Sequence, residues 1–257
     1  MNQQPPQPFP LPARLASRDP LQYFNQPSDS NNQASSLEQA LAIYHNNRKG
    51  VQIQALLKTF PCAVYLLSES LFATIAMQFI EQRPVAKSLE QVGVGFCRWL
   101  ALQPQAKPIL QDYPFIVALI NWECAWHQAY FAPRWNPVCP EQCLQQLSDI
   151  SSAKLSLPWQ LNQGVSVVTS YYAIDEIWST IRRLLNGKQT QLDIAKQDKQ
   201  LWLISPTKDS IAVIPIVHQQ LSQLQLSRKP WLSRLQPLSA DFVAQAIAQQ
   251  WLVNDYS

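Results

Sequence analysis

Hydrophobic residues recur at steps of three and four over the first half of the chain, from about residue 37 to residue 134. This spacing places them on one face of an α-helix. The first stretch, residues 39–61, carries two apolar halves separated by a polar run at residues 46–49. We interpret that run as a junction between two helices, at which the Asn side chains cap the helix ends. The alternative is that the same run contacts a partner.

Further helical patterns follow in the first half. We predict helices over residues 61–67 and 69–82, one that starts at the capping-box residue Ser88, and one that Asp112 caps. Large aromatic side chains on these helices predict the packed core of a helical bundle. These side chains are Phe72, Phe79, Phe96, Trp99, Phe115, Trp122, Trp126 and Tyr130.

The pattern changes after Pro133, where short strand-like segments interrupt the helical ones. A hairpin of two strands turns around residues 206–209, and two helices follow it. This order is compatible with a winged helix, so we predict a small α+β domain with helices on one side of its sheet. The predicted strands are residues 154–157, 165–170, 200–205, 211–217 and 252–256, and the predicted helices are residues 141–150, 174–185, 218–226 and 239–250, the last with Ser239 as its N-cap.

The predicted fold class is therefore an all-α helical bundle followed by a small α+β, winged-helix-like domain. Residues 1–36 are expected to form a Pro-rich tail and linker with one short helix, residues 37–135 the helical domain, and residues 136–257 the α+β domain. The prolines at the start of the tail favour polyproline II. We interpret the tail as a solvated segment, with a ligand for an SH3-like groove as the alternative.

Composition narrows the function classes. The chain has 257 residues, 47% of them hydrophobic, and its 5 Gly against 20 Pro disfavour Gly-rich phosphate loops. The net charge of +3 is evenly spread, because residues 1–134 carry 10 basic and 8 acidic residues and residues 135–257 carry 10 and 9. The chain therefore lacks the strongly basic half that is typical of nucleic-acid binding.

Targeting signals are not apparent in the sequence. It contains neither an apolar run of 18 residues nor a basic start followed by an apolar core. We therefore expect no transmembrane helix, no secretory signal and no membrane partner, and we place the chain in the cytoplasm by default. In that compartment the five Cys are expected to be reduced thiols.

Candidate chemistry centres on one predicted helix. Glu123 and His127 are four residues apart on it, so their side chains can meet. We interpret them as a structural polar pair beside the aromatic core, with an acid–base pair as the alternative. Cys124 and His127, together with Cys139 and Cys143, resemble a four-ligand zinc set. Because free Cys also serves as a small buried apolar residue, we expect no metal ion and no other cofactor.

The C-terminal hairpin and helices raise the question of DNA binding. The last predicted helix contains Gln but neither Lys nor Arg, and no basic residue follows Arg234. Since phosphate contacts supply most non-specific affinity for DNA, this helix is poorly suited to reading a duplex. A winged-helix-like module can instead bind a peptide that adds a strand to the edge of its sheet.

Several short motifs are spread along the chain. Their positions are Ile43, Tyr44, Asn46, Asn47, Ala55, Leu56, Phe60, Pro61, Phe72, Phe79, Gly93, Phe96, Leu100, Trp122, Glu123, His127, Tyr130, Tyr171, Ile177 and Trp178. In these motifs the chain resembles the HvfC/BufC family, over roughly residues 15–257. The chain departs from the family pattern at Arg48, Val92 and Ala173, and its cysteines Cys124, Cys139 and Cys143 do not belong to that pattern.

The resemblance implies a two-domain partner protein that is not an enzyme by itself. Such proteins are similar to recognition subunits that work with multinuclear non-haem iron oxidative enzymes. The enzyme subunit, a TIM barrel, modifies Cys residues of a small ribosomally made precursor peptide, and the products are often linked to copper handling. By this resemblance the helical domain docks the enzyme, and the C-terminal domain holds the leader of the precursor peptide.

The same resemblance makes the opening stretch the signature of a docking domain. The signature residues are Tyr44, Asn46, Asn47, Phe60 and Pro61. The candidate partner-binding residues are Tyr44, Asn46, Asn47, Arg48 and Lys49, among which we expect Arg48 and Lys49 to make the contacts and the Asn pair to form the helix junction. The family's N-terminal region also carries an older label as a DNA-binding domain. A DNA-binding transcriptional regulator is therefore the alternative function.

Overall fold

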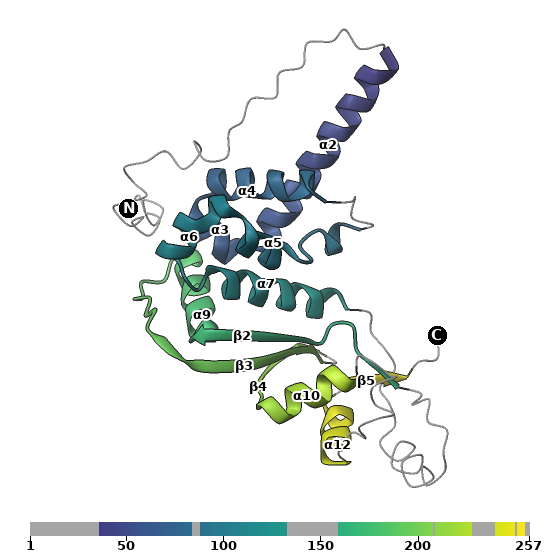
Figure 1. Ribbon diagram of the computed structural model, residues 1–257, viewed down its shortest axis with the longest axis vertical. Coiled ribbons are helices and arrows are strands. Elements are labelled where there is room, and N and C mark those ends of the chain that lie inside the picture. The colour runs from purple at the N-terminus through teal and green to yellow at the C-terminus, as the bar shows by residue number, and fades with distance from the viewer. Residues whose placement is uncertain are drawn as a thin grey trace. The chain divides into compact units, whose positions relative to one another are not determined.

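The computed structural model describes residues 36–83, 88–132, 159–207, 209–227, 240–249 and 251–254 (Figure 1). Helices dominate these residues, and a three-stranded antiparallel sheet lies in the second half of the chain. The predicted α+β character is confirmed at this level. The predicted N-terminal tail, the helix at residues 141–150 and the strand at residues 154–157 lie outside the described residues.

The chain forms two compact units. Unit 1 comprises residues 1–124 and 172–197, and unit 2 comprises residues 125–171 and 198–257. Each unit therefore draws on two separate stretches of the sequence. The predicted domain boundary, between residues 135 and 136, lies outside the described residues.

Unit 1 begins with a long helix, α2 (Ser36–Thr59), that runs without a break through residues 46–50. The predicted helix junction in this stretch is therefore wrong. Asn and Gly cost a helix interior only about 1 kcal/mol or less each relative to Ala, and α2 packs along α4 (Glu69–Glu81), which offsets that cost. The helix ends because Pro61 disfavours a helical conformation at Phe60, whose φ of −119° and ψ of 52° lie outside the helical region.

Two predicted helix starts in unit 1 are wrong. Ser88 makes no side-chain capping bond and precedes only a three-residue 3-10 helix, so the next α-helix starts after Gly95, whose φ is +81°. Asp112 was the second predicted start. It is instead the last residue of an earlier helix, which has Pro108 in its first turn. The remaining elements are α3 (Pro61–Leu67), η2 (Leu89–Gln91), α5 (Phe96–Leu102), η3 (Pro104–Ala106), α6 (Lys107–Asp112), α7 (Ile116–Phe131), which continues into unit 2, and α9 (Ile174–Leu185).

Phenylalanines from two helices and from the bend after α2 build the core of unit 1. Phe60, Phe72 and Phe79 surround Phe96, with ring centroids 5.3, 5.5 and 4.9 Å from its own. All four side chains are buried, as the helical spacing predicts for the three that lie on helices. Tyr130 does not follow the prediction, because its side chain is 71% exposed. Phe115 and Trp122 are buried, and Trp99 and Trp126 are half-buried.

Unit 2 holds the sheet, whose strand order is β2-β3-β4. The predicted hairpin is confirmed, with Pro206 opposite Ile211 and a turn in which the Thr207 amide donates to the Ser210 carbonyl at 2.8 Å. Two helices follow the hairpin, and a bond of 2.9 Å from Gln220 to Gln245 joins them. The elements are β1 (Trp159–Leu161), β2 (Ser166–Tyr172), β3 (Lys196–Pro206), β4 (Ile211–Pro215), α10 (His218–Ser227), α12 (Ala240–Ala248) and β5 (Leu252–Asn254), which pairs with β1. Ser239, the predicted N-cap, lies outside the described residues.

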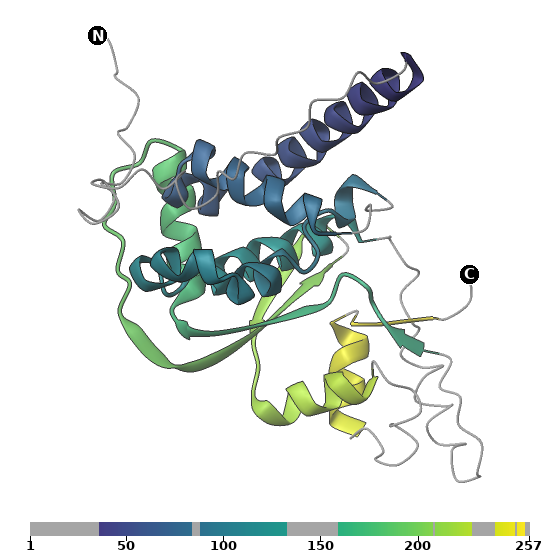
Figure 2. The same cartoon turned by 45° about the horizontal axis from the view of Figure 1, so that its top comes forward.

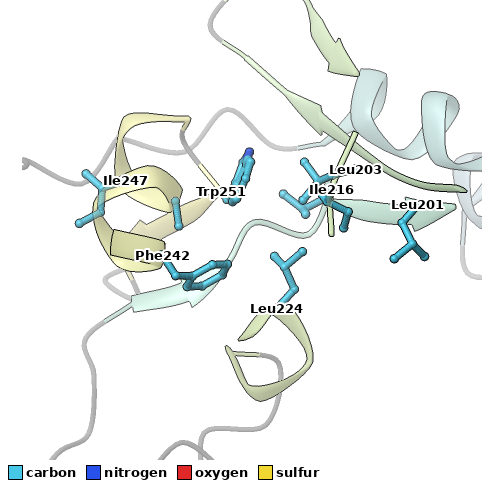
Figure 3. Packing of buried hydrophobic residues seen from close by; sticks show 9 residues of the cluster. Leu201, Leu203, Ile216, Leu224, Phe242, Ile247 and Trp251 are labelled. Atoms are coloured by element: carbon cyan, nitrogen blue, oxygen red, sulfur yellow. The ribbon is translucent and has the colours of Figure 1, made fainter. Parts of the chain in front are cut away.

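An apolar cluster joins the sheet of unit 2 to α10 and α12 (Figure 3). Trp251 is fully buried at its centre, and its backbone is held on both sides. Its amide donates to the Ala246 carbonyl at 2.7 Å, and its carbonyl accepts from the Asn162 amide at 2.8 Å. The buried members are Val165, Leu201, Leu203, Ile216, Leu224, Phe242, Ala246, Ile247 and Trp251.

A tight turn in unit 2 leads from β1 into β2. The buried side chain of Asn162 accepts from the Gly164 amide at 3.0 Å, and its carbonyl accepts from the Val165 amide at 2.9 Å. A Cβ atom at Gly164 would lie 2.5 Å from the Cβ of Ala132 and 3.0 Å from the Cγ of Pro206. Only glycine fits this position without a backbone shift.

We predict that Gly164→Ala lowers the free energy of unfolding by about 1–3 kcal/mol, because the new methyl group overpacks a closed site. Gly50→Ala in α2 is the matched control. Nothing lies within 4 Å of a Cβ there, so the substitution should stabilise the helix by about 0.5–1 kcal/mol. Urea denaturation of both variants measures the difference. Equal stability of the two variants would contradict the prediction.

Candidate functional site

The five residues predicted to bind a partner lie together on the middle of α2. Tyr44, Asn46 and Asn47 are exposed, whereas Arg48 and Lys49 are half-buried. The Nζ atom of Lys49 pairs with Oε1 of Glu81 at 3.0 Å, with 42% and 46% of the two side chains exposed. An ion pair of this exposure contributes at most about 1 kcal/mol. Because successive helical residues are 100° apart, these side chains point all round the helix and do not form one face.

Glu123 of α7 is a buried carboxylate that holds the start of α3. Its Oε1 accepts from the Cys62 amide at 2.8 Å and its Oε2 accepts from the Ala63 amide at 3.2 Å. The first amides of a helix have no partner inside that helix, and Pro61 contributes no N–H. The geometry therefore gives Glu123 a structural bond to the backbone of α3. His127, one turn further along α7, is half-buried, and its ring lies 4.6 Å from that of Phe131.

Burial controls the charge state of the groups around Glu123. Desolvation raises the pKa of the Glu123 carboxyl to about 7, although the amides of Cys62 and Ala63, the Cys62 side chain and the charge of Arg182 lower it. Burial, reinforced by the Glu123 charge, also raises the pKa of the Cys62 thiol far above its usual range. A thiol held neutral in this way is a poor nucleophile.

The cysteines of the predicted zinc set are only partly described. Cys124 is buried, with its Sγ 3.6 Å from the Gly93 carbonyl oxygen, and burial raises the pKa of its thiol to about 12. Cys139 and Cys143 lie outside the described residues. Within the ranges that the structure describes, no three His, Cys, Asp or Glu side chains are grouped so that they could hold a metal ion.

The outer edge of β4 pairs with no other strand among the described residues. The Ile216 amide donates to the Leu201 carbonyl at 2.9 Å, and the same register continues to the turn. Bonded pairs alternate along an antiparallel ladder, so residues 212 and 214 bond to β3. The backbone groups of Ile211, Val213 and Pro215 therefore point away from it. Unpaired edge groups of this kind are a template for a further strand.

The chemistry of this edge follows from its residues. Ile211 and Val213 each offer an N–H and a carbonyl, and Pro215 offers a carbonyl alone. The backbone of Ile214 bonds to β3, and its side chain packs against the apolar cluster of unit 2. A short extended peptide can therefore form backbone hydrogen bonds with this edge. The row of N–H donors ends at Pro215, which has none. The pattern of the sequence predicted this strand but not its place at the edge of the sheet. Pro215 was the one signal for that place, because proline within a sheet is found mainly on edge strands.

No protein-family model matches the chain, and no curated protein matches it. In the described part of the chain, no single helix has the length and apolar character needed to cross a membrane. One bent pair of helices, Ile43–Thr59 with Pro61–Leu67 at 95°, meets that test by length and composition alone.

We predict a pH-dependent contribution of Glu123 to stability. Its pKa is raised from 4.5 to about 7, so the folded state holds a proton that the unfolded state releases between those values. The stabilisation is present below pH 4.5 and is lost as the pH rises through 7. In Glu123→Gln this loss should disappear, so urea denaturation between pH 5 and 8 should show a flatter profile than that of the wild type.

Two further variants complete this test. Glu123→Ala leaves two buried amides without an acceptor and should be about 2–4 kcal/mol less stable than Glu123→Gln at any pH, because neither variant carries the titrating carboxyl. Glu90→Gln, at an exposed position of η2, should keep the wild-type profile. A wild-type pH profile in Glu123→Gln would show that the carboxyl does not titrate in this range.

Proposed function

We propose that the chain is a non-catalytic adaptor that binds a precursor peptide and presents it to a multinuclear non-haem iron enzyme for modification of Cys residues. The observation that carries this proposal is the outer edge of β4, which has no partner strand in the described part of the chain and offers backbone donors and acceptors beside an apolar cluster. The resemblance of the sequence to the HvfC/BufC family supports the same function. A cytoplasmic location is part of the proposal.

Unit 2 is the proposed peptide-binding unit. A hairpin followed by α10 and α12 (Figure 2) supports a winged-helix-like arrangement. In this proposal the leader of the precursor adds an antiparallel or parallel strand beside β4 and bonds to Ile211 and Val213. Strand addition reads backbone rather than bases, and α12 carries neither Lys nor Arg for phosphate contacts. These features favour a peptide over DNA.

Unit 1 is the proposed enzyme-docking unit. Its helices pack around a phenylalanine core, which supports the interpretation as a helical bundle. A rigid helical body of this kind can present a fixed surface to a second protein while the sheet edge of unit 2 holds the peptide. The chain then contributes binding and orientation, and the iron enzyme contributes the oxidative chemistry.

The first test is reconstitution with the iron enzyme and precursor peptide encoded by neighbouring genes. We expect the chain to co-purify with the enzyme and to be required for modification of the precursor, which mass spectrometry measures. A precursor that is modified equally well without the chain would refute the proposal. Salt-dependent binding to duplex DNA, with no binding to the peptide, would favour the regulator instead.

The second test removes a single donor from the edge. Val213→Pro deletes an N–H that points away from β3, so the ladder within the hairpin stays intact. We expect the dissociation constant of the precursor peptide, measured by fluorescence anisotropy, to rise about tenfold, the effect of roughly one lost hydrogen bond. Val213→Thr keeps the N–H and is the control. Unchanged affinity of a folded Val213→Pro variant would place the peptide elsewhere.

A further inference from the structure

The first half of α2 extends beyond the rest of unit 1. Residues 43–47 are all exposed, so none of the described residues covers this part of the helix. Burial begins one turn later, where Gln52 and Leu56 turn toward α4. Figures 1 and 2 both show this half of α2 projecting past the other helices of unit 1.

One arc of α2 carries three exposed apolar side chains and faces away from Leu56. With 100° between successive residues, Ile43, Val51 and Tyr44 span about 100° of the helix surface, and the exposed Asn47 lies between them. The side chains of Ile43, Tyr44 and Val51 are 62%, 62% and 52% exposed. Gln54 and Lys58 continue the same side, so this outer face runs for about 22 Å along the helix. Tyr44 and Val51 are seven residues apart, which is one of the spacings with which a helix anchors in the groove of a partner.

The charges that residues 39–59 of α2 bring to this face have one sign. From residue 39 to residue 68 the sequence contains no Asp or Glu. Lys58 is exposed at one end, and Arg48 is half-buried on the flank. Lys49 already pairs with Glu81. A complementary surface therefore has to supply carboxylates around an apolar centre.

The apolar side chains and the positive charge of the outer face distinguish between possible binding partners. A symmetric pairing of two copies of this face would leave Arg48 and Lys58 without carboxylate partners, because residues 39–68 contain no Asp or Glu. A nucleic acid would leave three large apolar side chains unburied, and two cations are few for phosphate binding. A different protein with an apolar patch and an acidic rim satisfies both the apolar and the charged groups.

We propose that the outer face of α2, formed by Ile43, Tyr44, Asn47, Val51, Gln54 and Lys58, is the surface that binds the enzyme subunit. The matching surface on the enzyme is an apolar patch flanked by Asp or Glu carboxylates. This inference rests on the proposed adaptor function and adds to it the docking face and the chemistry of the partner. Tyr44 is the main anchor, because a large aromatic side chain gives much contact area for little lost side-chain entropy.

The test measures binding of the full chain to the purified iron enzyme by biolayer interferometry. Tyr44→Ala and Lys58→Glu should each weaken binding about tenfold or more. The effect of Lys58→Glu should shrink at high salt, because exposed charges are then screened. Leu102→Ala and Lys107→Glu change equally exposed residues elsewhere in unit 1 and are the matched controls, expected to bind within about twofold of the wild type.

The outcomes separate this inference from the adaptor function. If the wild type binds the enzyme and Tyr44→Ala and Lys58→Glu bind equally well, the docking face is wrong and the adaptor function stands. If the wild type does not bind at all, the adaptor function itself fails. Vesicles of anionic phosphatidylserine and a DNA duplex are tested in parallel. Loss of binding to either of these in Tyr44→Ala, with enzyme binding unchanged, would assign the face to that partner and overturn the proposal.

Discussion

The buried carboxylate of Glu123 is the contact on which the arrangement of unit 1 depends. It joins the middle of α7 to the first amides of α3, at the point where Phe60 and Pro61 end α2. A helix start that is buried needs acceptors for its free amides, and here a side chain 60 residues away supplies them. The bond thereby fixes where α3 begins, and with it the direction in which α2 leaves the unit.

Unit 2 depends on a different constraint, the crowding around Gly164 and Trp251. The turn at Gly164 brings β1 and β2 past Ala132 with no room for a side chain, and Trp251 fills the space between sheet and helices. A closed core on this side holds β3 and β4 firmly in register. The outer edge of β4 can then stay open without unravelling, which a peptide-binding edge requires.

The two proposed surfaces use different kinds of recognition. The edge of β4 offers backbone groups, whose bonds depend little on the sequence of a leader peptide. The outer face of α2 offers side chains, Ile43, Tyr44 and Val51, that only a complementary protein surface covers. The proposed adaptor would use the edge of β4 for the precursor peptide and the outer face of α2 for the enzyme.

The sequence by itself determined the local elements, since helical spacing and a hairpin pattern depend on neighbours a few residues apart. Helices with buried Phe72, Phe79 and Phe96 and the β3–β4 hairpin were predicted in this way. The tertiary structure alone decided what depends on distant residues. It carried α2 unbroken through Asn46 and Gly50, because packing against α4 outweighs their weak helix propensity. It also decided the strand order that leaves β4 at the edge, and the amides that Glu123 meets, since neither follows from local spacing.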